Sequence, residues 1–433
     1  MFRPTYNLWR RAAEGLLVLL VFCVPLGTRL MGPPGLVAGH AVEWGTVSLF
    51  ATQILAGLFL AAVAFARPRF PAPAALLAAP LVVIIVISAL ASGHPSLSWL
   101  SAGWWLLLAV FVWLAVLALR PDVTGLAKVF VASTALQAVI GLQQFFSQAV
   151  TAAKWLGMAA QRPGLAGASV VETGGERWLR AYGTLPHPNV LGIFCVVGLV
   201  LAVALAARTA GWRRVGWSLV AFFVTAGLII SFSRSAWLAA AVGLTVLILA
   251  SAERGRALWR FGPPLLLVAA AVAVAAVLLP GLFSARLTAT GRLESASVTQ
   301  RLGSLADGRA LVAAHPFLGA GPGQAVAALA VLQPGRGWWL YEPPHFLPLT
   351  IAAEVGLPGL LAWLLLLVGI ARFLWRHAWL SDRPLEAVVA PAWPVAFLAA
   401  LTAGCFDHYF WTLWPAALLF WLVLGFAVVV TVE

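Results

Sequence analysis

The sequence is short of charged residues. Only 9% of its 433 residues are Asp, Glu, Lys or Arg, whereas 62% are hydrophobic. Soluble globular domains carry roughly 25% charged residues, so the composition excludes a soluble enzyme or binding domain as a description of most of the chain. The mean hydropathy of +0.98 indicates instead that most segments face lipid.

Cysteine is also scarce, and the motifs of nucleotide and metal chemistry are missing. The three cysteines lie in or beside apolar runs far apart in the chain: Cys23, Cys195 and Cys405. Their spacing fits neither a disulfide framework nor a zinc site, so they are interpreted as small core residues. The sequence has no phosphate-binding loop ending in Gly-Lys-Ser/Thr and no Asp-x-Asp pair. We therefore expect neither a nucleotide-driven pump nor a metal-dependent transferase, and neither a cofactor nor a bound metal.

Long apolar runs are abundant. Stretches such as "PLVVIIVISALA" and "PPLLLVAAAVAVAAVLL" carry no charge, and a membrane-spanning helix needs about 20 apolar residues. The sequence predicts an all-α polytopic membrane protein with about twelve transmembrane helices. The predicted spans are 12–31, 45–66, 72–92, 100–119, 125–148, 188–207, 214–232, 235–251, 262–280, 346–371, 387–404 and 408–430.

One apolar run is too long for a single span. Residues 217–250 form a run of 34 residues with Arg234 near its middle. One helix of that length would extend about 51 Å, well beyond the ~30 Å hydrocarbon core. The run predicts two spans joined by a tight turn at Ser231–Ser235.

The distribution of arginine predicts the orientation. With the N-terminus in the cytoplasm, basic clusters fall in the cytoplasmic loops, and the short external loops 32–44, 93–99 and 405–407 carry no Lys or Arg. This asymmetry follows the positive-inside rule. It holds only if the 34-residue run is divided into two spans at Arg234. The first apolar run lacks a small-residue cleavage site and is expected to be a retained span, with both termini cytoplasmic. The clusters are Arg67/Arg69, Arg120, Arg208/Arg213/Arg214, Arg254/Arg256/Arg260 and Arg372/Arg376/Arg383.

Two external segments are long. Loops beyond about 15 residues usually carry structure or function, so we expect short amphipathic helices in the second of them, over the external mouth of the bundle. The predicted organisation is transmembrane helices 1–5 (1–148), a first long periplasmic loop (149–187), helices 6–9 (188–280), a second long periplasmic loop (281–345) and helices 10–12 (346–433).

The formal net charge of +13 comes mostly from arginine, since the only lysines are Lys128 and Lys154. The basic residues are spread among cytoplasmic loops, which is typical of topology signals and of contacts with anionic membrane lipids. A nucleic-acid partner is not expected. The arginines on the opposite side need another explanation.

Two external arginines are candidate anion ligands. Arg234 lies in "SFSRSAW", and Arg180 lies in "RWLRAYGTLPHPNVLG" before the sixth span. Guanidinium groups bind phosphate through a bidentate fork, and a helix start capped by Asn189 would favour an anion as well. The alternatives are an interfacial or helix-capping arginine at 234 and an ordinary loop charge at 180.

His345 is a candidate base. It follows Pro343 and Pro344 and directly precedes a span. A neutral imidazole near pH 7 can accept a proton from an attacking hydroxyl; the alternative is an interfacial histidine that makes one hydrogen bond. Glu342 is near enough in sequence to orient the imidazole. Glu354 falls about 180° away around an ideal helix of about 100° per residue, which favours a structural role.

Further polar residues lie at the same external level. His187 in its Gly/Pro-rich turn, with Asp407 and His408 before the last span, are possible supporting residues. His315 and the segment Gly319–Gly323 fit a turn or a backbone anion site, and a loop-breaking role fits them equally well. Two arginines and a histidine with acidic neighbours favour group transfer from a phosphorylated membrane lipid.

The segments "RAYGTLPHPNVLG", "SFSRSAWLA", "GRALVAAHPFLGAGPGQ" and "PPHFLPLTIAAEVGLPGLLAWLLLL" occur in this order over about 180–370. In this part the sequence resembles the O-antigen ligase and O-antigen polymerase superfamily of bacterial inner membranes. The first five predicted spans match only as hydrophobic helices. Related sequences often have His-Asn where this chain has His345-Phe346, which leaves the role of the neighbour open.

The resemblance implies a GT-C-like, metal-independent membrane glycosyltransferase. Its donor would be a glycan on undecaprenyl pyrophosphate, and its acceptor would be lipid A-core for a ligase or a second lipid-linked glycan for a polymerase. By position, Arg180 and Arg234 would bind the donor pyrophosphate and His345 would activate the acceptor. A protein O-oligosaccharyltransferase and a lipid-linked glycan transporter are further alternatives. Transporters usually place polar groups near the middle of the membrane and often carry inverted repeats, which this sequence does not display.

Overall fold

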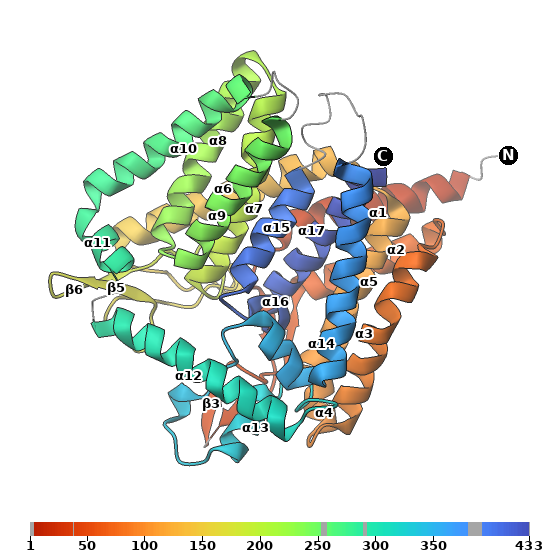
Figure 1. Ribbon diagram of the computed structural model, residues 1–433. Helices are drawn as coiled ribbons and strands as arrows, with labels where there is room; N and C mark the ends of the chain where they lie inside the picture. Colours follow the sequence, from red (N-terminus) through yellow and green to blue (C-terminus); the bar gives the residue numbers. More distant parts are fainter. Residues whose placement is uncertain (1–3, 38, 253–257, 289–291, 380–391, 433) are drawn as a thin grey trace.

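The computed structural model describes residues 4–37, 39–252, 258–288, 292–379 and 392–432 (Figure 1). Arg254, Arg256 and Arg383, which were assigned to cytoplasmic loops, lie outside these ranges. Within them the chain is mostly helical, and its strands form three separate two-stranded hairpins. The expectation of an all-helical chain missed these strands, which lie in segments assigned to the external side and, at residues 29–31 and 48–50, in the adjoining ends of two predicted spans.

The N-terminal part of the bundle consists of six helices before the first long loop. α5 continues from α4 through a π-helical turn at Trp99–Gly103, so that Pro95–Leu119 forms one 25-residue apolar segment. The predicted span 45–66 begins later in the structure because residues 48–50 pair as a strand. The helices are α1 (Pro4–Cys23), α2 (Ala51–Ala66), α3 (Ala72–Ala91), α4 (Pro95–Ser98), α5 (Trp104–Leu119) and α6 (Val123–Ser147).

The C-terminal part of the bundle is built around α7, which is buried along almost its whole length and packs against α6, α8, α9, α10 and α15. A helix surrounded on all sides is apolar all round, as this one is. The helices here are α7 (Pro188–Arg208), α8 (Gly211–Ile230), α9 (Arg234–Ala252), α10 (Leu258–Leu278), α14 (Leu347–Leu374), α15 (Ala392–Gly404) and α17 (Trp414–Val432), with the short α16 (Tyr409–Thr412) before the last.

Nine helices in the described ranges are long and apolar enough to cross a membrane. The structure is therefore that of a polytopic membrane protein. The predicted number of twelve stays a prediction, because α2 and α15 have only 16 and 13 residues and α1 carries Arg10, Arg11 and Glu14.

The two long loops and the 29–50 segment cover one end of the bundle (Figure 1). This end carries α12 and α13, and it lies opposite the start of α1 and the end of α17. Antiparallel hairpins join β1 to β4 and β2 to β3, and Val170 pairs with Leu179 across β5 and β6. The elements are β1 (Arg29–Met31), β2 (Gly35–Val37), β3 (His40–Val42), β4 (Ser48–Phe50), β5 (Val170–Thr173), β6 (Glu176–Leu179), α11 (Pro280–Thr288), α12 (Arg292–Ala314) and α13 (Ala325–Leu332).

The 34-residue apolar run is two helices, with α8 ending at Ile230 and α9 beginning at Arg234. Phe232 between them adopts a left-handed conformation (φ 46°), which is costly for a bulky side chain. Its ring is fully buried against Phe145, Trp237 and Phe283. This packing holds the turn in its strained shape.

Helix α14 breaks at Gly356, whose backbone (φ 74°, ψ 175°) is not helical. The glycine-rich segment after α12 lies against this break: the N–H groups of Ala320 and Gly321 donate to the carbonyls of Ala353 and Glu354 at 2.8 and 2.9 Å. A Cβ on Gly319 would lie 2.2 Å from the Glu354 carbonyl carbon. The structure therefore supports the turn among the roles expected for this segment, because its N–H groups donate to the carbonyls at the break in α14.

Candidate active site

Two buried arginines bind the turn between α8 and α9. Arg180, after β6, donates from Nε to the Ser231 carbonyl at 2.7 Å. Arg286 of α11 donates from Nε to the Phe232 carbonyl at 2.7 Å. The two side chains are only 6% and 4% exposed. Consecutive carbonyls of one strained turn therefore hold two guanidinium groups near each other.

Arg234 is the first residue of α9 and is half-buried on the same turn. The structure thus places both sequence-predicted arginines, Arg180 and Arg234, around residues 231–233, and it adds Arg286. Burial, and next the positive charge of Arg286, lower the pKa of Arg180 to about 9. Positive charges this close are stabilised by an anion, and guanidinium groups match the oxygens of a phosphate.

Asn189 connects this arginine group to the opposite side of the site. Its Oδ1 accepts from Nη2 of Arg180 at 2.5 Å, and its Nδ2 donates to Oδ2 of Asp407 at 3.0 Å. The expectation that Asn189 caps α7 was wrong. Pro188 occupies the first helical position, so the cap is His187, whose Nδ1 accepts from the Asn189 N–H at 3.0 Å. The Asn189 side chain is thereby left to bridge a cation and an acid.

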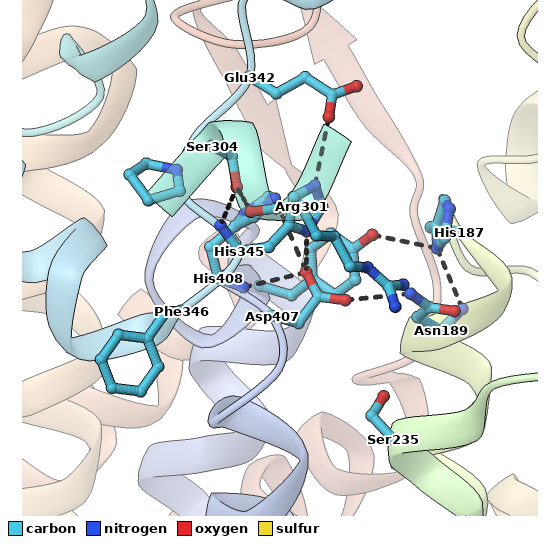
Figure 2. Close-up of polar contacts among 12 residues, drawn as sticks. His187, Asn189, Ser235, Arg301, Ser304, Glu342, His345, Phe346, Asp407 and His408 are labelled. Carbon is cyan, nitrogen blue, oxygen red and sulfur yellow. Dashed lines mark hydrogen bonds and ion pairs between the residues drawn. The ribbon is translucent and has the colours of Figure 1, made fainter. Parts of the chain in front are cut away.

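His345 lies between two carboxylates (Figure 2). Its Nδ1 is 3.4 Å from Oδ1 of Asp407, and its Nε2 is 3.2 Å from Oε2 of Glu342. Its backbone N–H donates to Oγ of Ser304 on α12 at 3.1 Å. The structure therefore brings three sequence-predicted residues together: the candidate base, the neighbouring Glu342, and Asp407 from 62 positions away.

The surroundings of His345 contradict the expectation of a neutral imidazole near pH 7. Burial lowers the pKa of His345, but the hydrogen bonds to Asp407 and Glu342 outweigh it and raise the pKa to about 9. The imidazole is therefore protonated at neutral pH in this structure. Sequence reasoning placed Glu342 beside the histidine, but it could not show the second carboxylate.

Asp407 is 2% exposed and is the most connected acid of the site. Burial raises its pKa, yet the hydrogen bond with His345 and the nearby imidazoles outweigh burial and hold the pKa well below its usual range. Oδ1 also accepts from the backbone N–H of His408 at 3.0 Å. Asp407 is therefore ionised and fixed, which orients His345 through Nδ1.

His187 and His408 are neutral, buried neighbours of the site. Burial, followed by the charge of Arg180, lowers the pKa of His187 to about 3; burial also lowers the pKa of His408 to about 3. His187 accepts at Nδ1 and lies 3.1 Å from Oγ of Ser169 through Nε2. The hydroxyl of Tyr409 lies 3.1 Å from the same Nδ1. This geometry gives His187 a structural role at the start of α7.

Among the described residues, His345, Asp407 and His408 form a group whose potential metal-ligand atoms lie within 4.8 Å of one another. Oδ1 of Asp407 lies 3.4 Å from His345 and 3.7 Å from Nε2 of His408. Nε2 of His408 is buried and has no hydrogen-bond partner in the part of the chain that the structure describes. His345 and Asp407 form an ion pair with each other, so two of the three potential ligands already have a partner. The expectation that no metal takes part stays a prediction.

Three residues of the site were not predicted from the sequence. Arg286 and Arg301 were counted only as charges of a long external loop, and Ser304 was not singled out. Figure 2 shows Arg301 on α12 beside His345 and Asp407, and its charge acts on Arg180 and Tyr409. The signal that was available is that "GRLESASVTQRLGSLADGR" places arginines in a long loop assigned to the external side, where the positive-inside rule gives them no role.

Glu354 lies apart from His345. Its Oε2 accepts from the Gly323 N–H at 2.8 Å and from Nε1 of Trp411 at 2.9 Å. The helical angle used for the prediction does not apply directly, because His345 precedes the start of α14 and Phe346 is its extended N-cap. The separation of Glu354 from His345 agrees with the structural role expected for Glu354.

Comparison with known proteins identifies part of the chain. Residues 219–364 match the family described as O-antigen ligase, so the resemblance predicted from the sequence is confirmed. The matched range contains Arg234, Arg286, Arg301, Glu342 and His345. No curated protein matches the chain. A solved structure described as "Structural coordination of polymerization and crosslinking by a peptidoglycan synthase complex" is similar at 15% identity with a TM-score of 0.42, covering 84% of this chain and 97% of that one.

Proposed function

Because the O-antigen ligase match includes the candidate base and part of the arginine group, we propose that this protein is a membrane glycosyltransferase. It transfers a glycan from undecaprenyl pyrophosphate to a hydroxyl acceptor on the periplasmic face of a bacterial inner membrane. The observation that carries the proposal is the joining of a buried arginine group to a His–Asp pair through Asn189. The arginine group fits a diphosphate, and the His345–Asp407 pair can position and deprotonate a hydroxyl.

The donor diphosphate lies at the arginine group. Arg180, Arg234 and Arg286 surround the turn 231–233, and Arg301 approaches from α12. In the reaction, the acceptor oxygen forms a bond to the anomeric carbon of the glycan while the bond from that carbon to the phosphate oxygen breaks. The electron pair leaves with undecaprenyl pyrophosphate, and arginine charges stabilise the added negative charge of this leaving group. These groups provide electrostatic stabilisation from the chain itself.

The acceptor hydroxyl reaches His345 from the side of Glu342. Asp407 is buried, whereas the Glu342 side chain is 32% exposed. When the acceptor hydroxyl takes the place of Glu342 at Nε2, His345 loses one of the two partners that raise its pKa. The Nε2 proton leaves with the Glu342 carboxylate as it is displaced, and the neutral Nε2 then accepts the hydroxyl proton while Asp407 holds Nδ1. Glu342 acts here as a positioning residue, because it sets the protonation state of His345.

The sidedness of the site supports the periplasmic assignment. His345, Asp407 and the arginine group lie at the end of the bundle covered by α11, α12 and the hairpins (Figures 1 and 2). The basic clusters of the short loops were assigned to the other end, which the positive-inside rule places in the cytoplasm. Both termini belong to that cytoplasmic side in this proposal.

The test uses purified protein, a lipid-linked glycan and two acceptors, lipid A-core and a second lipid-linked repeat. We expect release of undecaprenyl pyrophosphate together with one glycan product. Modified lipid A identifies a ligase, and a longer lipid-linked glycan identifies a polymerase. Movement of the labelled lipid between leaflets without either product would instead identify a transporter. Full turnover by a folded His345→Ala variant would remove His345 from the proposed role.

A further inference from the structure

A cavity lined by aromatic side chains lies next to the His345 site. It has a volume of about 60 Å³, and four tryptophans line it: Trp44, Trp105, Trp411 and Trp414. At roughly 10–15 Å³ per water, it has room for roughly four to six waters. The cavity is partly open, so a group larger than water can insert from the external side.

The four tryptophans of the cavity come from three distant parts of the chain. Trp44 belongs to the 29–50 segment, Trp105 to α5, and Trp411 and Trp414 to α16 and α17. Trp105 and Trp414 pack edge to face at 6.1 Å between ring centroids. Nε1 of Trp414 donates to Thr52 at 2.8 Å and that of Trp411 to Glu354 at 2.9 Å. These bonds fix the indole rings in place before a ligand arrives.

The cavity also presents polar groups suited to neutral hydroxyls. Ser48 lines the cavity and is only 9% exposed. Its buried Oγ has no hydrogen-bond partner within the described part of the chain. Such a group is normally satisfied. Arg29 and Glu43, which also line the cavity, pair with each other at 3.1 Å. With Glu354 as a second acidic residue in the lining, the cavity disfavours phosphate and favours an uncharged, hydroxyl-bearing ligand.

The cavity adjoins the His345 site through His408. The Trp44 ring lies edge-on to His408 at 5.1 Å between centroids, and the His408 ring lies 5.1 Å from that of His345. Pro343, two residues before His345, is part of the lining. His345 also connects through Asp407 and Asn189 to Arg180. The base is therefore linked by side-chain contacts to both the tryptophan cavity and the arginine group.

We propose that this cavity binds a sugar ring of the acceptor glycan, next to the sugar whose hydroxyl attacks. The inference rests on the proposed function. Indole rings cover the apolar C–H faces of a pyranose, while Ser48 and the carboxylates bind its hydroxyls, which is the mixture of apolar walls and few polar groups typical of ligand sites. The tryptophan cavity thus selects the acceptor, and the arginine group holds the donor.

Binding is tested without catalysis, by saturation-transfer difference NMR on the detergent-solubilised protein. The probes are methyl glycosides of glucose, galactose, mannose and N-acetylglucosamine. We expect ring-proton signals from at least one probe, lost in Trp44→Ala and reduced in Ser48→Ala. Trp155→Ala is the control, because Trp155 is 81% exposed and lies outside the cavity lining. Absence of signal from every probe, or signals equal to wild type in both cavity variants, overturns the proposal.

Transfer kinetics give a second readout. Ser48→Ala removes an unpartnered hydroxyl, which leaves folding unharmed, so a rise in acceptor KM cannot be attributed to misfolding. We expect acceptor KM to rise about fivefold in Ser48→Ala and about tenfold or more in Trp44→Ala, with donor KM and kcat nearly unchanged. Wild-type transfer with unchanged acceptor KM in both variants overturns the cavity assignment and leaves the proposed function standing. If the wild type binds the glycosides but transfers no glycan, the cavity assignment stands and the proposed function is overturned.

Discussion

Nδ2 of Asn189 donates a 3.0 Å hydrogen bond to Oδ2 of Asp407, a residue 218 positions away in the sequence. The same amide accepts from Arg180 through Oδ1. Asn189 is 3% exposed, so one buried side chain holds the arginine group and the His345–Asp407 pair at a fixed distance. The bridge couples the donor part of the site to the acceptor part.

Removing this bridge tests the coupling. Asn189→Ala removes one buried hydrogen-bond partner from the Arg180 guanidinium and one from the Asp407 carboxylate, and such a loss costs about 1–3 kcal/mol. We expect that decrease in the free energy of unfolding, and a fall in kcat/KM of about 5- to 150-fold. Thr225→Ala is the control, since its buried hydroxyl bonds only to Ala221 within α8 and should leave kcat/KM unchanged. Wild-type kcat/KM in Asn189→Ala would contradict the coupling.

The second prediction concerns pH. His345 has a pKa raised to about 9, and only its deprotonated form accepts a proton. The profile of kcat/KM, which reports the free enzyme, should therefore rise with pH toward about 9. Glu342→Gln removes one of the groups that raise the pKa, so the rise should occur at lower pH. A profile that falls as pH increases toward this value would show that protonated His345 is the active form.

The raised pKa of His345 also predicts how its contribution to the free energy of unfolding changes with pH. The pKa of His345 is higher in the folded protein than the value of about 6.5 in unfolded chains, so its contribution is fully present below that value. The contribution is lost as pH rises through about 9. The difference in unfolding free energy between wild type and His345→Gln should thus shrink between these limits, as measured by denaturant unfolding in detergent.

The third prediction concerns the arginine that sequence reasoning missed. Arg286→Ala should weaken binding of undecaprenyl pyrophosphate by about 10- to 150-fold, because hydrogen bonds to charged groups contribute about 1.5–3 kcal/mol. The measurement is equilibrium binding in detergent micelles. Arg292→Ala is the matched control: its side chain is 80% exposed on the neighbouring helix and pairs with Glu172. Equal affinity in both variants would remove Arg286 from the donor site.

The fourth prediction compares two glycines of α12. A Cβ on Gly308 would lie 2.6 Å from a Leu349 side-chain carbon and 2.7 Å from one of Pro344, whereas a Cβ on Gly303 meets nothing within 4 Å. Gly303→Ala should raise the melting temperature slightly, since alanine is favoured in helices by about 1 kcal/mol over glycine. Gly308→Ala gains the same helix propensity but displaces the segment before α14 that carries His345. We expect kcat to fall at least tenfold in Gly308→Ala alone.

The fifth prediction concerns metal ions. The ligand atoms of His345, Asp407 and His408 lie within 4.8 Å of one another, but the proposed reaction uses them for positioning and proton transfer. EDTA should leave transfer unchanged. Loss of transfer in EDTA that Zn²⁺ or Mg²⁺ restores would overturn the metal-independent mechanism.

The sequence by itself determined the membrane class, the long apolar helices and the turn at residues 231–233. These features follow from local composition, because an uninterrupted apolar run satisfies its backbone only as a helix in lipid. The external arginines 180 and 234, and His345 after two prolines, were also visible, since charge and proline stand out against an apolar background.

Only the tertiary structure decided which of these residues meet. The bridge of Asn189, the entry of Asp407 into the His345 site and the addition of Arg286 and Arg301 depend on helices far apart in sequence. The raised pKa of His345 has the same origin, because it needs two carboxylates from different segments. The four tryptophans of the cavity likewise come from three distant parts of the chain. Burial and charge are properties of the packed surroundings, and a linear pattern carries no distance between segments that fold together.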